Sequence, residues 1–278
     1  MAYVTDFDLS VKYRTFDNKF YLTIELAYDM SAPNGQKLMT NYLKPLIVLT
    51  GMLALQGNTL PKDVQAMDPD NPTCPAEPNW TSNKEMVLTP IQKNDTKVLL
   101  AEGVVDVGLP DRLKKILADN PDIAEIWLRS PGGHARAGNE AGRIIRELGG
   151  LMITRIPAGW SCFSACNFVF MGGRARIIEA DGGFMVHMFT MTGDRNAINY
   201  SIEMGTDSTV ELIGEVEQES ALLATEDNDF LIRMGVSRKL LKDIMYKQKA
   251  VKVEGSDQST RRCLTKEEAI KYNVANVE

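Results

Sequence analysis

The chain has 278 residues, of which 44% are hydrophobic and 24% are charged, an ordinary composition for a globular protein. Its net charge of −6 and the lack of a basic run argue against a nucleic-acid partner. Because it has two histidines and no Cys-x-x-Cys pair, the sequence predicts no metal site and indicates no cofactor.

Residues 8–30 are predicted to form a β-hairpin. The segments Val11–Phe16 and Phe20–Leu26 are rich in β-branched and aromatic residues, and Asp17 and Asn18 supply the turn between them. We assign residues 1–56 to a β-rich N-terminal extension. Residues 57–94 follow as a linker or extended surface arm, because prolines, asparagines and aspartates crowd the stretch 68–78.

The segment Met39–Leu55 leaves the compartment open. It has a lysine before a short apolar run, as a secretory signal does, but it lies inside the chain. It is too short and too interrupted by glycine to be a good transmembrane helix. We favour a buried strand or helix, which fits a cytoplasmic protein; if the segment is a signal or anchor, the protein is exported.

From about residue 95 the pattern changes to alternating strands and helices. This alternation predicts an α/β fold with a largely parallel sheet, in one domain of residues 95–278. The expected strands are 98–101, 123–128, 152–156, 175–178 and 183–187, and the expected helices are 109–117, 137–148, 164–171, 210–234 and 237–247.

Three features of this region carry the chemistry of acyl transfer. Ser164 follows a strand and begins an apolar helix, which exposes its hydroxyl and puts the N–H of Ala165 at a positive helix terminus. A second N–H donor can come from the turn Ser130-Pro-Gly-Gly133, where glycine lets a carbonyl approach closely. His187, at the end of a strand, is a candidate proton acceptor.

Other side chains compete for these roles. His134, beside the glycine turn, is the other histidine and is an alternative base or a substrate contact. Cys162 and Cys166 flank Ser164, and a thiol needs less activation than a hydroxyl, but their positions are less suitable for attack. Their spacing of four residues permits a disulfide; we favour two small apolar residues that pack inside the fold.

Residues 95–278 resemble the Clp protease proteolytic subunit and its crotonase-fold relatives. The likeness rests on Ser130-Pro-Gly-Gly-His-Ala-Arg-Ala-Gly138, on the serine turn at Ser164, on Met185-Val-His187 and on Thr265-Lys-Glu-Glu-Ala-Ile-Lys-Tyr-Asn-Val274. The flanking cysteines depart from the usual Clp serine turn. The resemblance implies a Clp/crotonase-type fold, a ββα superhelix, behind the N-terminal β-rich extension.

The resemblance also implies roles for individual residues. Ser164 would be the nucleophile and His187 the general base, with Gly133 and Ala165 as oxyanion-hole donors. A carboxylate should follow the last long helix. Two residues fit this part of the family pattern, and we prefer Asp243 to Asp257, which is more simply a hairpin tip.

The predicted function is therefore that of a serine peptidase with a Ser-His-Asp mechanism, acting on a peptide or protein. The alternatives are an inactive scaffold or binding protein, and an acyl-CoA enzyme that uses the same oxyanion turn. Family relatives form rings, and the apolar residues of helix 210–234 exceed what one solvent-facing helix needs, so we expect a homo-oligomer. No residue indicates whether an ATPase or adaptor assists.

Overall fold

The computed structural model describes residues 3–16, 19–31, 66–69, 71–245 and 261–277. The chain divides into two units, Met1–Leu60 and Pro61–Glu278. In the first unit, β1 (Tyr3–Phe16) and β2 (Lys19–Ser31) pair antiparallel, so the predicted hairpin is confirmed. Its turn residues, and the segment Met39–Leu55, lie outside the described residues. No helix in the described part of the chain is long and apolar enough to cross a membrane.

The second unit is built on a five-stranded sheet of order β3-β4-β5-β6-β8. The last four strands run parallel and β3 joins the edge antiparallel, so the α/β fold class with a largely parallel sheet is confirmed. The strands are β3 (Val87–Lys93), β4 (Thr96–Glu102), β5 (Ile123–Arg129), β6 (Ile153–Ile156) and β8 (Ala175–Ile178).

Three helices connect and cover these parallel strands: α1 (Leu109–Asp119), α2 (Ala135–Glu147) and α3 (Cys166–Met171). In α1 the residues Leu109, Leu113 and Leu117 are buried, at the helical spacing that the sequence predicted. Parallel strands need cover on both faces, and Leu99 in β4 is accordingly inaccessible to solvent.

A second, three-stranded sheet positions the segments that carry Ser164 and His187. Its order is β10-β9-β7, made of β10 (Arg261–Cys263), β9 (Gly183–His187) and β7 (Ser161–Phe163). The pair β7–β9 is parallel and puts Phe163 opposite Met185. Ser164 directly follows Phe163, and His187 lies two residues after Met185 at the end of β9, so the sheet register brings the two residues close together. The sequence analysis found β9 but missed β7, which is only three residues long.

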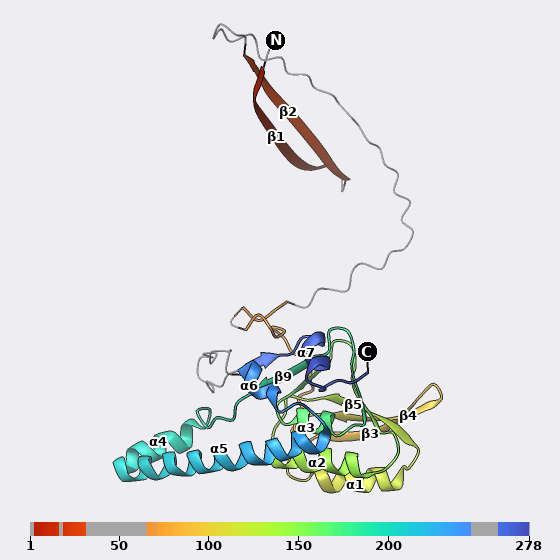
Figure 1. Cartoon of the computed structure of the whole chain (residues 1–278), viewed down its shortest axis with the longest axis vertical. Coiled ribbons are helices and arrows are strands. Elements are labelled where there is room, and N and C mark those ends of the chain that lie inside the picture. Colours follow the sequence, from red (N-terminus) through yellow and green to blue (C-terminus); the bar gives the residue numbers. More distant parts are fainter. Residues whose placement is uncertain (1–2, 17–18, 32–65, 70, 246–260, 278) are drawn as a thin grey trace. The chain divides into compact units, whose positions relative to one another are not determined.

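The C-terminal half adds four helices: α4 (Arg195–Met204), α5 (Thr206–Met234), α6 (Lys239–Met245) and α7 (Lys266–Lys271). The predicted helix 210–234 is longer at its start and is preceded by α4. Gly205, with φ 104°, separates the two. Figure 1 shows α4 and the first part of α5 extending beyond the sheets as a helical pair.

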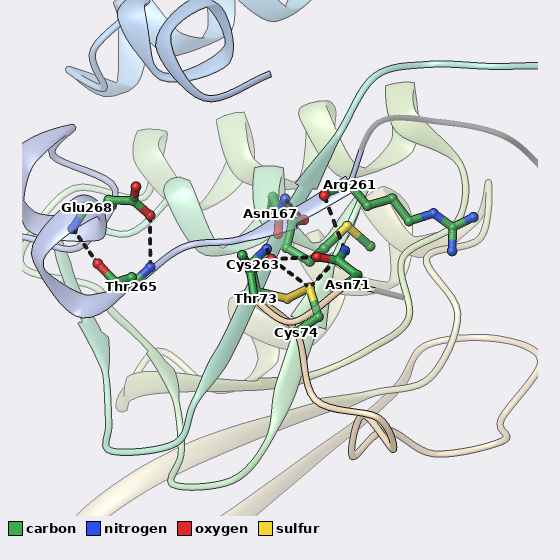
Figure 2. The surroundings of a disulfide bond; sticks show 9 residues. Asn71, Thr73, Cys74, Asn167, Arg261, Cys263, Thr265 and Glu268 are labelled. Carbon is green, nitrogen blue, oxygen red and sulfur yellow. Dashed lines mark hydrogen bonds between the residues drawn. A yellow bond between two sulfur atoms is a disulfide. The ribbon is translucent and has the colours of Figure 1, made fainter. Parts of the chain in front are cut away.

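The described residues of the predicted linker, 66–69 and 71–94, instead belong to the folded unit, which corrects the assignment of 57–94. Cys74 forms a buried disulfide with Cys263 of β10, and the side chain of Asn71 donates to the carbonyl of Arg261 at 3.2 Å (Figure 2). Asn79 accepts a hydrogen bond from the N–H of Ser161 at 3.0 Å. These bonds hold a proline-rich stretch whose composition alone indicates an unattached arm.

Candidate active site

Ser164 lies in a tight turn between β7 and α3 rather than at the first position of the helix. Its φ of 55° is a left-handed conformation that costs a non-glycine residue free energy and is common at functional sites. Its N–H donates to the carbonyl of Met185 at 3.3 Å. On the other side Gly132 packs so closely that an added Cβ would lie 2.5 Å from the Cβ of Ser164. The turn is therefore fixed from two sides.

The hydroxyl of Ser164 is within hydrogen-bond distance of His187. Ser164 Oγ lies 2.7 Å from His187 Nε2, and Nδ1 of the same ring lies 2.8 Å from the carbonyl oxygen of Met188. A carbonyl can only accept, so this contact requires the proton on Nδ1. In the neutral ring Nε2 is then the unprotonated nitrogen and accepts from the serine O–H, as a general base must.

His134, the competing histidine, occupies a different position. It is the N-cap of α2, and its Nδ1 accepts the N–H of Ala137 at 3.1 Å. It lines the same pocket as Ser164 but its Nδ1 is engaged in capping a helix. This geometry favours His187 as the base.

The predicted oxyanion donors, Gly133 and Ala165, both line the pocket at Ser164. Among the described residues, neither N–H donates a hydrogen bond to a protein group. The glycine turn is held by its neighbours: His134 N–H donates to Val105 at 2.7 Å, and Val105 N–H donates to Gly132 at 2.8 Å. Two free N–H donors on a fixed backbone beside a serine hydroxyl are what an oxyanion hole requires.

A disulfide brackets the serine, which corrects the expectation of two unbonded, packing cysteines. Cys162 in β7 and Cys166 at the start of α3 are bonded, with their Cα atoms 5.4 Å apart, and both are inaccessible to solvent. The left-handed turn at Ser164 reverses the chain between them, so residues four apart come into bonding range. With both sulfurs bonded, neither cysteine can act as the nucleophile.

The third residue of the predicted triad remains a prediction. Asp243 lies in α6, where its carboxylate accepts a hydrogen bond from the hydroxyl of Tyr272 at 3.4 Å. The structure gives it no hydrogen bond to the described atoms of His187. Asp257, the alternative, lies outside the described residues.

A pocket of about 430 Å³ opens beside Ser164 and His187. Most of its wall is apolar and comes from α3, α5 and α6: Phe168, Met171, Leu223, Leu231, Leu240 and Leu241. Three charged side chains, Arg136, Glu219 and Asp227, complete it. Arg136 pairs with Glu219 at 2.7 Å and with Glu226 at 3.1 Å. Burial, with a smaller contribution from Glu226, raises the pKa of Asp227 to about 7.

The sequence analysis missed Asp227, although the sequence holds a signal for it. Leu223, Phe230, Leu231 and Met234 form the buried face of α5, and Asp227 falls on that face at a spacing of four from two of the leucines. An acidic residue inside an apolar stripe of a helix is unusual and indicates a specific environment.

The described residues contain no cluster of side chains suited to hold a metal ion.

No known protein family matches the chain by its sequence, and no curated protein matches it. Among solved structures, a mutant of ClpP1 from Listeria monocytogenes is similar, with a TM-score of 0.43 and 16% sequence identity. The similarity covers 64% of this chain and 88% of that one.

The disulfide that brackets Ser164 is expected to stabilise the turn. In the double variant Cys162→Ala, Cys166→Ala, the free energy of unfolding should fall by about 2 kcal/mol, because the unfolded chain is no longer constrained by this short loop. Hydrogen exchange at the amides of 163–167 should accelerate, while the amides of α1 serve as an internal control. Unchanged exchange at 163–167 would show that the bond does not hold the turn.

Proposed function

We propose that this protein is a serine peptidase of the Clp/crotonase type. The observation that carries the proposal is the 2.7 Å contact between Ser164 Oγ and His187 Nε2, beside the free N–H donors of Gly133 and Ala165. The motifs 130–138 and 185–187 and the serine turn at Ser164, which resemble those of Clp proteolytic subunits, indicate the same residues independently of the geometry.

The mechanism follows from the positions of these groups. His187 Nε2 takes the hydroxyl proton as Ser164 Oγ attacks the peptide carbonyl carbon. The carbonyl oxygen becomes an oxyanion and accepts hydrogen bonds from the two backbone donors. As the tetrahedral intermediate collapses, the imidazolium gives its proton to the leaving amine, and an acyl-serine remains. Water, deprotonated by the same nitrogen, attacks this ester and regenerates Ser164.

The competing functions fit the site less well. A scaffold has no need for a serine held in a left-handed conformation with its hydroxyl in contact with a histidine ring nitrogen. An acyl-CoA enzyme would use the glycine turn but would leave the Ser164–His187 pair without a role.

Two disulfides among the described residues favour an oxidising compartment, and with it the exported alternative.

Labelling by a fluorophosphonate tests the nucleophile, because the probe reacts only with an activated serine. The wild-type protein should be labelled, and Ser164→Ala should lose labelling and hydrolysis while keeping its fold. His187→Ala should lower both by at least about a thousandfold, since the members of such a unit fail together. His134→Ala should have the smaller effect. Labelling retained in Ser164→Ala would identify a different nucleophile.

The role of Asp243 can be separated from its contact with Tyr272. If Asp243 orients His187, Asp243→Asn should lower turnover by orders of magnitude without a comparable loss of stability. Tyr272→Phe, which removes the hydroxyl that Asp243 accepts from, is the matched control and should leave turnover near the wild-type value. Equal modest effects of both variants would make Asp243 a structural residue, and loss of turnover in Asp257→Asn would move the role to that residue.

We also propose that the protein assembles as a homo-oligomer. The helical pair α4–α5 exposes large apolar side chains, each half or more accessible: Tyr200, Ile202, Met204, Val210, Ile213 and Leu222. Such a surface on an element that extends beyond the sheets is typical of contacts between copies. Analytical ultracentrifugation should find an oligomer at micromolar concentration, which the double variant Val210→Asp, Ile213→Asp shifts to smaller species. A wild-type monomer would contradict this.

A further inference from the structure

The pocket beside Ser164 contains an acid that the peptidase mechanism does not use. Asp227 is on the inner face of α5, one helical turn from Leu223 on one side and from Leu231 on the other. All three line the pocket, together with Phe168 and Met171 of α3. Asp227 therefore presents a carboxylate in a wall that is otherwise largely apolar.

This carboxylate has no cation of its own. The carboxylate of Asp227 makes no side-chain hydrogen bond or ion pair with another residue in the described part of the chain. The nearby guanidinium of Arg136 already contacts Glu219 and Glu226. These four side chains, Arg136, Glu219, Glu226 and Asp227, comprise three carboxylates and one guanidinium. Their formal charge is −2 when all are ionised.

Asp227 is partly buried, and withdrawing the charged form of an acid from water is unfavourable unless an opposite charge pairs with it. Burial raises the pKa of Asp227 to about 7, so its charged form is destabilised near neutral pH. A cation in the pocket would reverse the effect, because an opposite charge favours the ionised form. Ser164 and Asp227 line the same largely apolar pocket, which suits a flexible aliphatic chain.

We infer that this pocket binds a substrate side chain with an aliphatic stem and a cationic end, lysine or arginine, and that Asp227 binds the cation. The stem would pack against Phe168, Leu223 and Leu231 while the scissile carbonyl lies at Ser164. The pocket volume, about 430 Å³, is within the usual range for ligand sites. That the ligand is a peptide rests on the proposed function. Binding of the cationic side chain by Asp227 does not require hydrolysis of the peptide.

Binding to the full chain carrying Ser164→Ala tests the pocket without catalysis. The probes are acetyl-Ala-Ala-Lys methylamide and its norleucine counterpart, which keeps the aliphatic stem and lacks the ammonium group. Both are titrated while the protein is observed by NMR. The lysine peptide should bind about tenfold more tightly, and adding Asp227→Asn should remove this preference. Asp229→Asn, an exposed position on the same helix, is the matched control and should retain it.

Two outcomes would overturn the inference: the norleucine peptide bound as tightly as the lysine peptide by the Ser164→Ala protein, or a lysine preference that survives Asp227→Asn. A third probe, the glutamine counterpart, tests the charge: if it binds more tightly than the lysine peptide, Asp227 acts as a neutral acid and the inference is wrong. Thermal unfolding of each variant checks that it is folded. Hydrolysis of the corresponding lysine and norleucine thioesters by the wild type separates the two proposals. A lysine preference in binding with no hydrolysis refutes the peptidase and keeps the pocket, whereas hydrolysis without a preference refutes the pocket alone.

Discussion

The left-handed turn at Ser164 is the constraint on which the site depends. A φ of 55° reverses the chain between β7 and α3, points the hydroxyl at His187 and leaves the next N–H, that of Ala165, free of protein partners among the described residues. Such a conformation persists only when its surroundings hold it. Here they do so through Met185, Gly132 and the Cys162–Cys166 bond.

The same arrangement explains why the second sheet matters. The pairing of β7 with β9 fixes the position of Ser164 relative to His187, because Ser164 directly follows the end of β7 and His187 is the last residue of β9. β10 then pairs with the other edge of β9 and is tied to residue 74 by a disulfide across 189 residues of sequence. A bond that closes so long a loop removes much of the entropy of the unfolded chain. β9, the strand that ends at His187, therefore has a paired strand on each edge.

Much of the α/β unit could be predicted from the sequence, because local patterns determine it. The leucine spacing of α1 and the apolar runs of β4, β5 and β9 identify their elements directly. Motif order led to the prediction of Ser164 and His187 as a pair, and their side chains lie within hydrogen-bond distance of each other. What could not be predicted depends on tertiary contacts. The spacing of Cys162 and Cys166 fits both a bond and simple packing, and only the turn between them decides. The partner of Cys74 lies far along the chain, so composition alone assigned its segment to a linker. Asp227 carries a local signal, but its meaning depends on the pocket formed by α3 and α6.

In the proposed mechanism, Ser164, His187 and two backbone donors form one preorganised site for an oxyanion. A crystal structure of the protein after reaction with a fluorophosphonate tests this most directly, since the phosphoryl oxygen of the adduct occupies the place of the oxyanion. We expect phosphorus bonded to Ser164 Oγ and the phosphoryl oxygen about 2.7–3.1 Å from the backbone nitrogens of Gly133 and Ala165. An adduct whose oxygen points away from both nitrogens, or one formed on a different residue, would contradict it.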